Sequence, residues 1–201
     1  MELGQIHLGT EFGGVLCTLA RHPDLKSFVE VGTWNGRGST QCLMAGLVDR
    51  TDDWSLMSLE TNPARHAGAV KHWEGVAPDR LRLVLGRLST AIMRPEDVAA
   101  HPLVQPPWQD WYEEEIADFH QAPLVSLPPT VDAVLLDGGE FSTCGDWEAV
   151  QAAHPRVVAM DDTTSIKCYG IVAQLSADPA WELLGAGDER GGWAVYRRVP
   201  A

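Results

Sequence analysis

The sequence predicts an α/β fold, with one domain built on a doubly wound, mostly parallel sheet of seven strands. Short apolar runs alternate with segments of helical spacing along the whole chain of 201 residues. The last two apolar runs are joined by a turn-rich segment, 185–192, which predicts that the sheet ends in an antiparallel hairpin. Because 45% of the residues are hydrophobic, the chain can bury one full core.

In the first half of the chain, three helices alternate with three strands. An apolar run at 28–31 precedes a glycine-rich turn, and a second run at 54–59 closes on Glu60. Apolar residues three and four positions apart, such as Phe12 and Leu16, indicate a helix. We therefore expect helices over 9–20, 39–48 and 64–73, and strands over 28–31, 54–59 and 81–85.

The second half begins with an insert at about 90–129, where prolines interrupt the alternation. Long inserts in compact domains often form lids or binding loops, so we expect this one to cover a substrate. The near-continuous apolar run at 131–137 is typical of a buried parallel strand. We expect helices over 95–100, 111–116, 147–153 and 166–175, and further strands over 156–160, 181–184 and 193–197.

The composition argues against several classes of protein. The formal net charge is -13, whereas nucleic-acid binding favours a basic face, so we expect no nucleic-acid partner. No stretch is apolar enough to span a membrane, and the first residues do not resemble a signal peptide, so we expect a cytoplasmic protein without a membrane partner. The 4 cysteines are scattered, which favours reduced thiols over a zinc site or disulfides.

A glycine-rich loop follows the first predicted strand. Gly32, Gly36 and Gly38 have the spacing Gly-x-x-x-Gly-x-Gly, and Ser39 opens the next helix. Glycines let the backbone approach a ligand closely, and the free N–H groups of a helix start attract anionic or polar groups. The spacing differs from the Gly-x-Gly-x-x-Gly of dinucleotide loops, which disfavours an NAD-linked oxidoreductase.

Acidic residues stand where the predicted strands end, and ligands bind at such ends in open α/β sheets. Glu60 lies about 20 residues beyond the glycine loop, where an acid can accept the hydroxyls of a ribose. Asp137 ends the fourth strand, and Asp161 and Asp162 follow the fifth. These three carboxylates would repel one another unless something cationic lies among them. Their oxygens suit Mg²⁺ or another divalent cation, which we predict there.

The segment 30–38, acid-x-Gly-x-x-x-Gly-x-Gly, resembles motif I of the class I S-adenosylmethionine (SAM)-dependent methyltransferases. The order of the expected elements over essentially the whole chain is similar to the Rossmann-like fold of that family. The segments 135–139 (Leu-Leu-Asp-Gly-Gly) and 159–163 (Ala-Met-Asp-Asp-Thr) resemble those of its metal-dependent members, such as catechol O-methyltransferase and the sugar and macrolide O-methyltransferases. A related branch that resembles cephalosporin hydroxylase carries similar acids.

The resemblance implies a SAM-dependent methyltransferase that methylates a hydroxyl oxygen of a small molecule with the help of Mg²⁺. Asp137, Asp161 and Asp162 would hold the metal ion, which would chelate the substrate and lower the pKa of its hydroxyl. The residues expected to bind SAM are Glu30, Gly32, Gly36, Gly38, Ser39, Glu60 and Asp137.

A general base in this family often lies a few residues after the acid of the fourth strand. Glu140 stands there, where relatives have lysine or histidine. Lys167, directly after the predicted metal pair, and His120 in the insert are the other candidates, with His101 as a further one. The small-molecule acceptor is expected to lie under the insert.

Two other functions stay open on the sequence. One is a metal-independent methyltransferase with another acceptor, and the other is a nucleoside-binding protein that does no chemistry. Relatives that methylate nitrogen carry Asn/Asp-Pro-Pro-aromatic after the fourth strand, whereas this chain has Asp-Gly-Gly-Glu at 137–140. Related small enzymes often self-associate, so a homo-oligomer is also an expectation.

Overall fold

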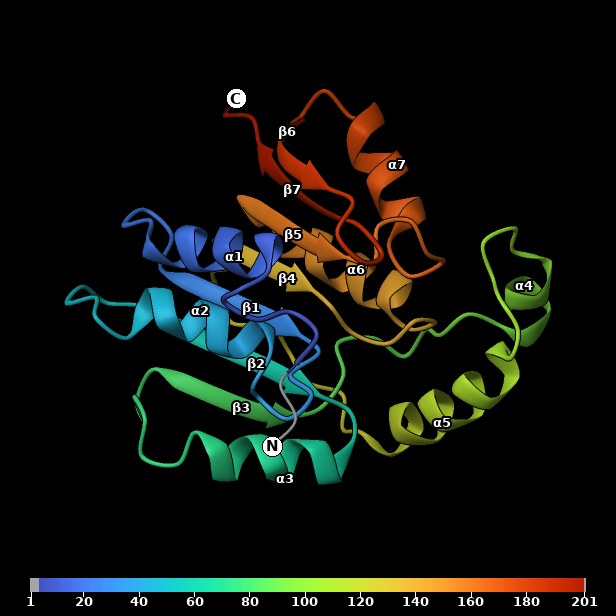
Figure 1. Cartoon of the computed structure of the whole chain (residues 1–201), viewed down its shortest axis with the longest axis horizontal. Helices are drawn as coiled ribbons and strands as arrows, with labels where there is room; N and C mark the ends of the chain where they lie inside the picture. Colours follow the sequence, from blue (N-terminus) through green and yellow to red (C-terminus); the bar gives the residue numbers. More distant parts are fainter. Residues whose placement is uncertain (1–3, 201) are drawn as a thin grey trace.

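The structure is a computed structural model that describes residues 4–200. Its centre is a seven-stranded sheet with the strand order β3-β2-β1-β4-β5-β7-β6 (Figure 1). The first five strands are parallel, while β7 pairs antiparallel with both β5 and β6. The predicted doubly wound sheet with a C-terminal antiparallel hairpin is therefore confirmed. The strands are β1 (Ser27–Val31), β2 (Ser55–Glu60), β3 (Leu81–Leu85), β4 (Ala133–Leu136), β5 (Val157–Asp161), β6 (Trp181–Gly187) and β7 (Trp193–Arg198).

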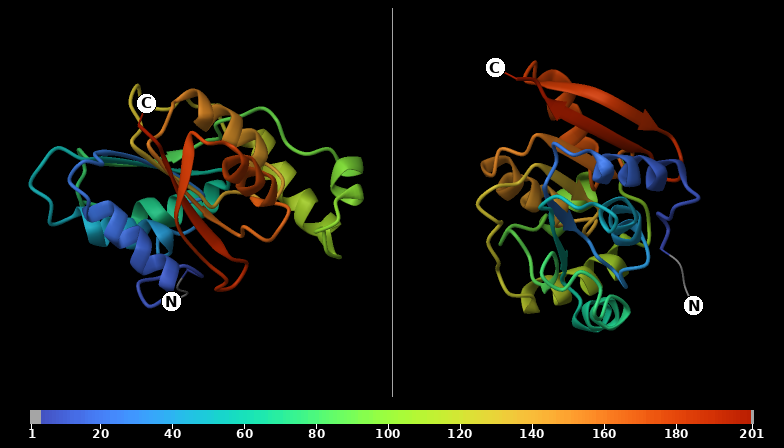
Figure 2. Two further views of the ribbon diagram at one scale, coloured as in Figure 1. Left: turned by 90° about the horizontal axis from the view of Figure 1, so that it is seen from above. Right: turned by 90° about the vertical axis from the view of Figure 1, so that its left-hand side faces the viewer.

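Helices cover both faces of the sheet, and those of the insert lie apart from these two layers (Figure 2). The helices are α1 (Glu11–Arg21), α2 (Ser39–Leu47), α3 (Pro63–His72), α4 (Pro95–Ala100), α5 (Trp108–Gln121), α6 (Thr143–Ala152) and α7 (Tyr169–Ala177). None of the helices within 4–200 has the length and apolar character needed to cross a membrane. All 4 cysteines are free, as predicted.

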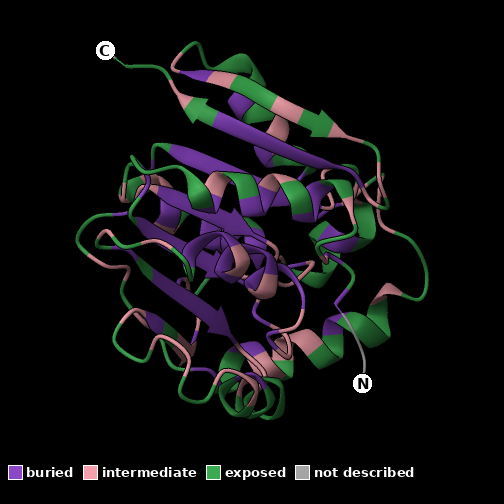
Figure 3. Ribbon diagram, turned by 60° about the vertical axis from the view of Figure 1, so that its left-hand side comes forward, coloured by how far each residue is buried: buried purple, intermediate pink, exposed green. Residues whose placement is uncertain are grey.

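Alternation along the strands divides the core in two. Phe28 and Leu56 face one side and pack with α1 and α2, whereas Val29 and Met57 face the other and join α6 and α7. Because both faces are covered, all residues of β1, β4 and β5 are buried (Figure 3). This explains why these strands are mainly apolar in the sequence.

The insert contains α4 and α5, which lie beyond the carboxyl ends of the strands (Figure 1). It has a small core of its own, in which Val98 and Tyr112 pack with Phe141 and Ile166 from the main domain. The expected helix at 111–116 is part of a longer one, because α5 runs over 14 residues and buries Tyr112 and Phe119.

Both helices that follow the insert begin at other residues than predicted. α6 begins at Thr143 rather than at 147, since Glu115 of α5 accepts hydrogen bonds from the backbone N–H groups of Phe141 and Ser142 just ahead of it. α7 begins at Tyr169 rather than at 166. Residue Lys167 therefore lies in a loop and not in a helix, where its side chain is free to turn toward the ends of β4 and β5.

Candidate functional site

A cavity of about 810 Å³ opens at the carboxyl ends of the parallel strands. Its walls come from the glycine loop after β1, the ends of β2, β4 and β5, the turn after β3, and α5 of the insert. Polar and charged side chains line it at every strand end. The volume suits a ligand of the size of a nucleoside derivative together with a small second molecule.

The glycine loop is held close to β4 by its backbone. Gly32 has a φ of 100°, a left-handed value that favours glycine, and a Cβ at this position would lie 2.0 Å from the carbonyl oxygen of Asp137. Gly38 precedes α2 without any side-chain cap, and both Gly38 and Ser39 line the cavity. The start of α2 therefore offers its backbone N–H groups to a polar or anionic ligand group.

Gly36, predicted as a SAM contact, is not among the residues that line the cavity. It has a φ of 75°, and its carbonyl oxygen accepts a hydrogen bond of 2.9 Å from the indole nitrogen of Trp73. A Cβ there would lie 2.7 Å from that nitrogen, so the glycine lets the loop pack against the end of α3. Its role in this structure is to shape the loop.

Glu30 lies under the loop rather than in the lining of the cavity. Its side chain is 0% exposed and accepts hydrogen bonds from the hydroxyls of Thr40 and Ser58. Burial raises the pKa of the Glu30 carboxyl to about 7. The predicted direct contact with the SAM ammonium therefore stays a prediction, and the observed contacts tie β1 to α2 and β2.

We expect Glu30→Gln to flatten the dependence of stability on pH. The folded state holds the proton of Glu30 up to about pH 7, whereas the unfolded chain releases it near 4.5, so stability falls as the pH rises between these values. The loss is about 3 kcal/mol across that window. Urea unfolding at pH 4.5 and pH 8 checks this, with exposed Glu148→Gln as control. An unchanged slope in Glu30→Gln would show that Glu30 does not carry the effect.

Glu60 is at the end of β2, in the cavity wall, and is 7% exposed. Its Oε2 accepts a hydrogen bond of 2.6 Å from the backbone N–H of Trp34, and its Oε1 accepts one of 2.9 Å from that of Asn62. Each carboxylate oxygen has a second lone pair that stays available. Glu60 is thus fixed by two backbone groups and can still accept the two hydroxyls of a ribose.

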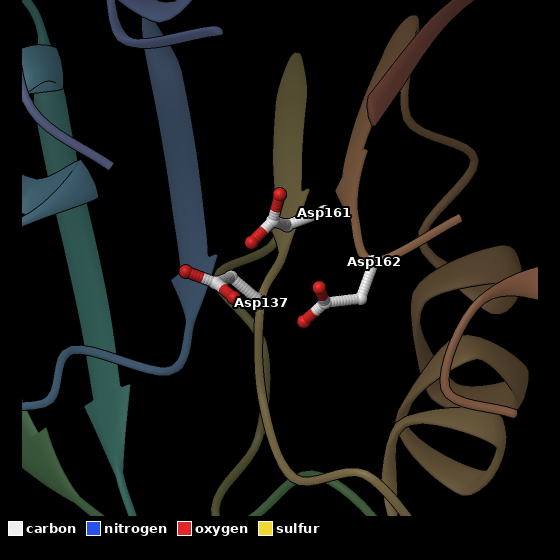
Figure 4. A group of neighbouring side chains, drawn as sticks. All are labelled: Asp137, Asp161 and Asp162. Atoms are coloured by element: carbon white, nitrogen blue, oxygen red, sulfur yellow. The ribbon is translucent and has the colours of Figure 1, made fainter. Parts of the chain in front are cut away.

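The three predicted metal ligands lie together. Asp137 follows β4, Asp161 ends β5 and Asp162 is the next residue, and one carboxylate oxygen from each lies within 4.8 Å of the others (Figure 4). Asp162 has a φ of 54°, an uncommon value for a residue other than glycine. The sequence-based prediction that these carboxylates converge is confirmed.

Two protein cations already bind these carboxylates. The Nζ of Lys167 lies 2.8 Å from Asp137 Oδ1 and 2.9 Å from Asp162 Oδ2. The guanidinium of Arg190, in the turn between β6 and β7, lies 2.5 Å from Asp161 Oδ2. The carboxylate oxygens are the ligand atoms that Mg²⁺ prefers, but each aspartate already forms an ion pair with a lysine or arginine of the same chain. As folded, the cluster does not fit a divalent ion unless Lys167 moves away.

The candidates for the general base lie in different places relative to the cavity. Glu140 and Lys167 both line the cavity, whereas His120 and His101 do not. His120 is exposed at the end of α5, with its ring against Phe119. Burial raises the pKa of the Glu140 carboxyl. Of the predicted catalytic residues, the structure therefore brings Glu140 and Lys167 to the same place and leaves the two histidines outside.

Several residues at the cavity escaped the sequence analysis. Asn62, the N-cap of α3, donates a hydrogen bond of 2.9 Å to Asp118 of α5, which links the insert to the main domain beside the cavity. Asp146 in the first turn of α6 lines the cavity at 4% exposed, and burial raises the pKa of its carboxyl to about 7. Arg190 lies in the turn between β6 and β7, which the sequence indicates only as the connection of the hairpin. No motif marks these positions, since each depends on contacts between distant segments.

Comparisons with known proteins place the fold. No protein-family model matches the chain, and no curated protein matches it. Among solved structures, the chain is similar to an O-methyltransferase from Bacillus cereus in complex with SAH (17% identity, 98% of this chain, 84% of that chain, TM-score 0.62). It is also similar to the SAH-bound Podospora anserina methyltransferase PaMTH1 (14%, 94%, 78%, 0.62). A third is the O-methyltransferase TomG from Streptomyces achromogenes in complex with SAM, which is involved in tomaymycin synthesis (16%, 98%, 84%, 0.58). This chain therefore has the class I methyltransferase fold.

Proposed function

We propose, from this fold and from the cavity at its strand ends, that the chain is a SAM-dependent methyltransferase acting on a hydroxyl oxygen of a small molecule. The observation that carries the proposal is the joint placement of the glycine loop, the start of α2 and Glu60 around one cavity. A nucleoside with an amino-acid tail requires an acceptor for its ribose hydroxyls and N–H donors for the carboxylate of its tail, and these groups provide both. The SAM- and SAH-bound neighbours support the same reading.

Different residues along the cavity would bind different parts of SAM. Glu60 would hold the ribose hydroxyls, and the N–H groups at Gly38 and Ser39 would meet the carboxylate of the tail. SAM supplies a methyl group on a positively charged sulfur, and this group passes to the acceptor by an in-line displacement. Positioning of the acceptor oxygen therefore contributes most of the rate. Glu140, a carboxyl whose pKa burial raises, is the candidate that takes the acceptor proton.

The expected Mg²⁺ ion stays a prediction. The three predicted ligands converge, but Lys167 and Arg190 contact one carboxylate oxygen of each. This observation favours a reaction that needs no metal ion, and the proposed acceptor stays a hydroxyl oxygen. The acceptor would enter beside Glu140, under the insert, where a second, smaller cavity of about 260 Å³ is lined by Trp108 and Trp111.

Calorimetric titration tests the proposal. We expect SAM and SAH to bind with micromolar dissociation constants and NAD not to bind, because the glycine loop lacks the dinucleotide spacing. The titrations are run with Mg²⁺ and again with EDTA. A protein that binds NAD, or that shows neither heat nor a thermal shift with SAM and SAH, would contradict the proposal. Binding without transfer of a labelled methyl group to any hydroxylated acceptor would favour the non-catalytic nucleoside-binding alternative.

A further inference from the structure

The cluster of Asp137, Asp161 and Asp162 raises the question of what neutralises it. Three carboxylates with oxygens within 4.8 Å of one another repel strongly in a partly buried place. A divalent cation is one solution to this repulsion. The structure contains another, because Lys167 and Arg190 bring two positive charges to the same three side chains.

Lys167 is built into the cluster. Its side chain is 5% exposed, and its ammonium group bridges Asp137 and Asp162, which come from different strand ends. Moving it away would separate the ammonium from both carboxylates that it contacts in the structure. A surface lysine attracted to nearby acids would instead remain mostly exposed and mobile.

The loop that carries Lys167 is fixed on both sides. The hydroxyl of Ser165 donates to the carbonyl oxygen of Asp162 and accepts from the backbone N–H of Lys167. The backbone N–H groups of Thr163 and Thr164 donate to the carbonyl oxygens of Gly192 and Gly191 in the hairpin turn. These bonds hold the turn that carries Arg190 against the same loop, so the two cations and the acids form one connected unit.

From this geometry we propose that the ammonium of Lys167 occupies the cation position of the site, that the protein needs no divalent ion there, and that the ammonium binds the acceptor oxygen. An ammonium group has three N–H donors, and the two aspartates use two of them. Lys167 lines the cavity, so the third can point to a hydroxyl or carboxylate oxygen of the acceptor. This role in acceptor binding rests on the proposed function, whereas the exclusion of metal does not.

The chemistry balances without a metal. The acceptor O–H bond breaks, with its proton passing to the Glu140 carboxylate, and an O–CH₃ bond forms. The carbon–sulfur bond breaks at the same time, with its electron pair going to the sulfur. Lys167 stays protonated throughout and stabilises the negative charge that develops on the acceptor oxygen.

The electrostatics of Lys167 agree with this role. Burial alone would lower the pKa of its ammonium, but Asp137 and Asp162 raise that pKa well above its usual value. With both aspartates hydrogen-bonded to its ammonium, Lys167 is placed as a donor to the acceptor oxygen rather than as the general base that the sequence also suggested.

Metal binding tests the proposal without any need for activity. The probe is Mn²⁺, followed by electron paramagnetic resonance of the free ion, with Mg²⁺ in thermal-shift assays. We expect wild-type protein to leave Mn²⁺ free up to millimolar concentration. Lys167→Met removes the internal cation and leaves the carboxylates for a metal, so we expect it to bind Mn²⁺ at least 10-fold more tightly. Lys71→Met, at an exposed position of α3, is the control, and Lys167→Arg should exclude metal as the wild type does.

The metal-binding results test the role of Lys167, and SAH binding tests the proposed function. Metal-dependent refolding of Lys167→Met would support the proposal, because an ion that binds only the folded state stabilises it. Should that variant not fold at all, the wild-type titration decides. Wild-type protein that binds Mn²⁺ at micromolar concentration, or a Lys167→Met variant that folds but gains no affinity, would overturn it. Absence of SAH binding would instead contradict the proposed function and leave the metal result standing.

Discussion

Gly32→Ala is expected to lower the free energy of unfolding by about 3–5 kcal/mol, which is a large part of the stability of a typical domain. Gly32 has a φ of 100°, and a Cβ there would lie 2.0 Å from the carbonyl oxygen of Asp137. That oxygen cannot move aside easily, because the N–H of Asp137 is bonded to the carbonyl of Val31 at 2.9 Å. Backbone strain and the overlap therefore both act on the ends of β1 and β4.

Urea unfolding followed by circular dichroism measures this loss. Gly68→Ala is the matched control, since Gly68 is an exposed residue within α3 and a Cβ there has nothing within 4 Å. Alanine in the middle of a helix is favoured over glycine by about 1 kcal/mol, so the control should be slightly more stable than the wild type. Equal stability of Gly32→Ala and Gly68→Ala would show that the close approach of the loop to β4 is not required.

Glu60→Gln is expected to weaken SAH binding by about 10- to 100-fold, which corresponds to roughly 1.5–3 kcal/mol for hydrogen bonds to a charged group. The carboxylate is held by the N–H groups of Trp34 and Asn62 and, in our proposal, accepts the ribose hydroxyls. An amide offers one acceptor oxygen in place of two. Calorimetry with SAH measures the change, and exposed Glu74→Gln should bind like the wild type.

Because Glu60 also orders the loop, a second ligand separates the two roles. A SAH analogue without the ribose hydroxyls should bind the wild type more weakly than SAH does. Glu60→Gln should bind both ligands with nearly equal affinity, since the interaction that distinguishes them is gone. A variant that still discriminates between SAH and the analogue as strongly as the wild type would remove Glu60 from the ribose site.

The sequence predicted the fold well because its signals are local. The parallel strands are short and mainly apolar runs, and burial on both faces favours apolar residues along their whole length. The hairpin followed from the turn residues between β6 and β7. Helix starts were less accurate, and the residues just before α6 are bonded to Glu115, which is distant in the sequence.

Local signals in the sequence also predicted part of the site. Strand ends place Glu60, Asp137 and Asp161 at one edge, so their convergence could be expected from topology alone. The cations that contact the aspartates could not be predicted from topology, because Lys167 was expected within a helix and Arg190 within a turn. The sequence required that something cationic lie among the acids, and the structure shows that the chain itself supplies such a group. The hydrogen bonds of Glu30 could not be predicted either, since its partners Thr40 and Ser58 come from other elements.

A crystal structure of the protein with SAH tests the central claim most directly. We predict that the adenosine lies over the glycine loop with its ribose hydroxyls on Glu60, and that the sulfur faces the cavity beside Asp137 and Glu140. We also predict that Lys167 still bridges Asp137 and Asp162. SAH bound elsewhere, or a cavity that remains empty at millimolar SAH, would contradict the assignment of this chain as a methyltransferase.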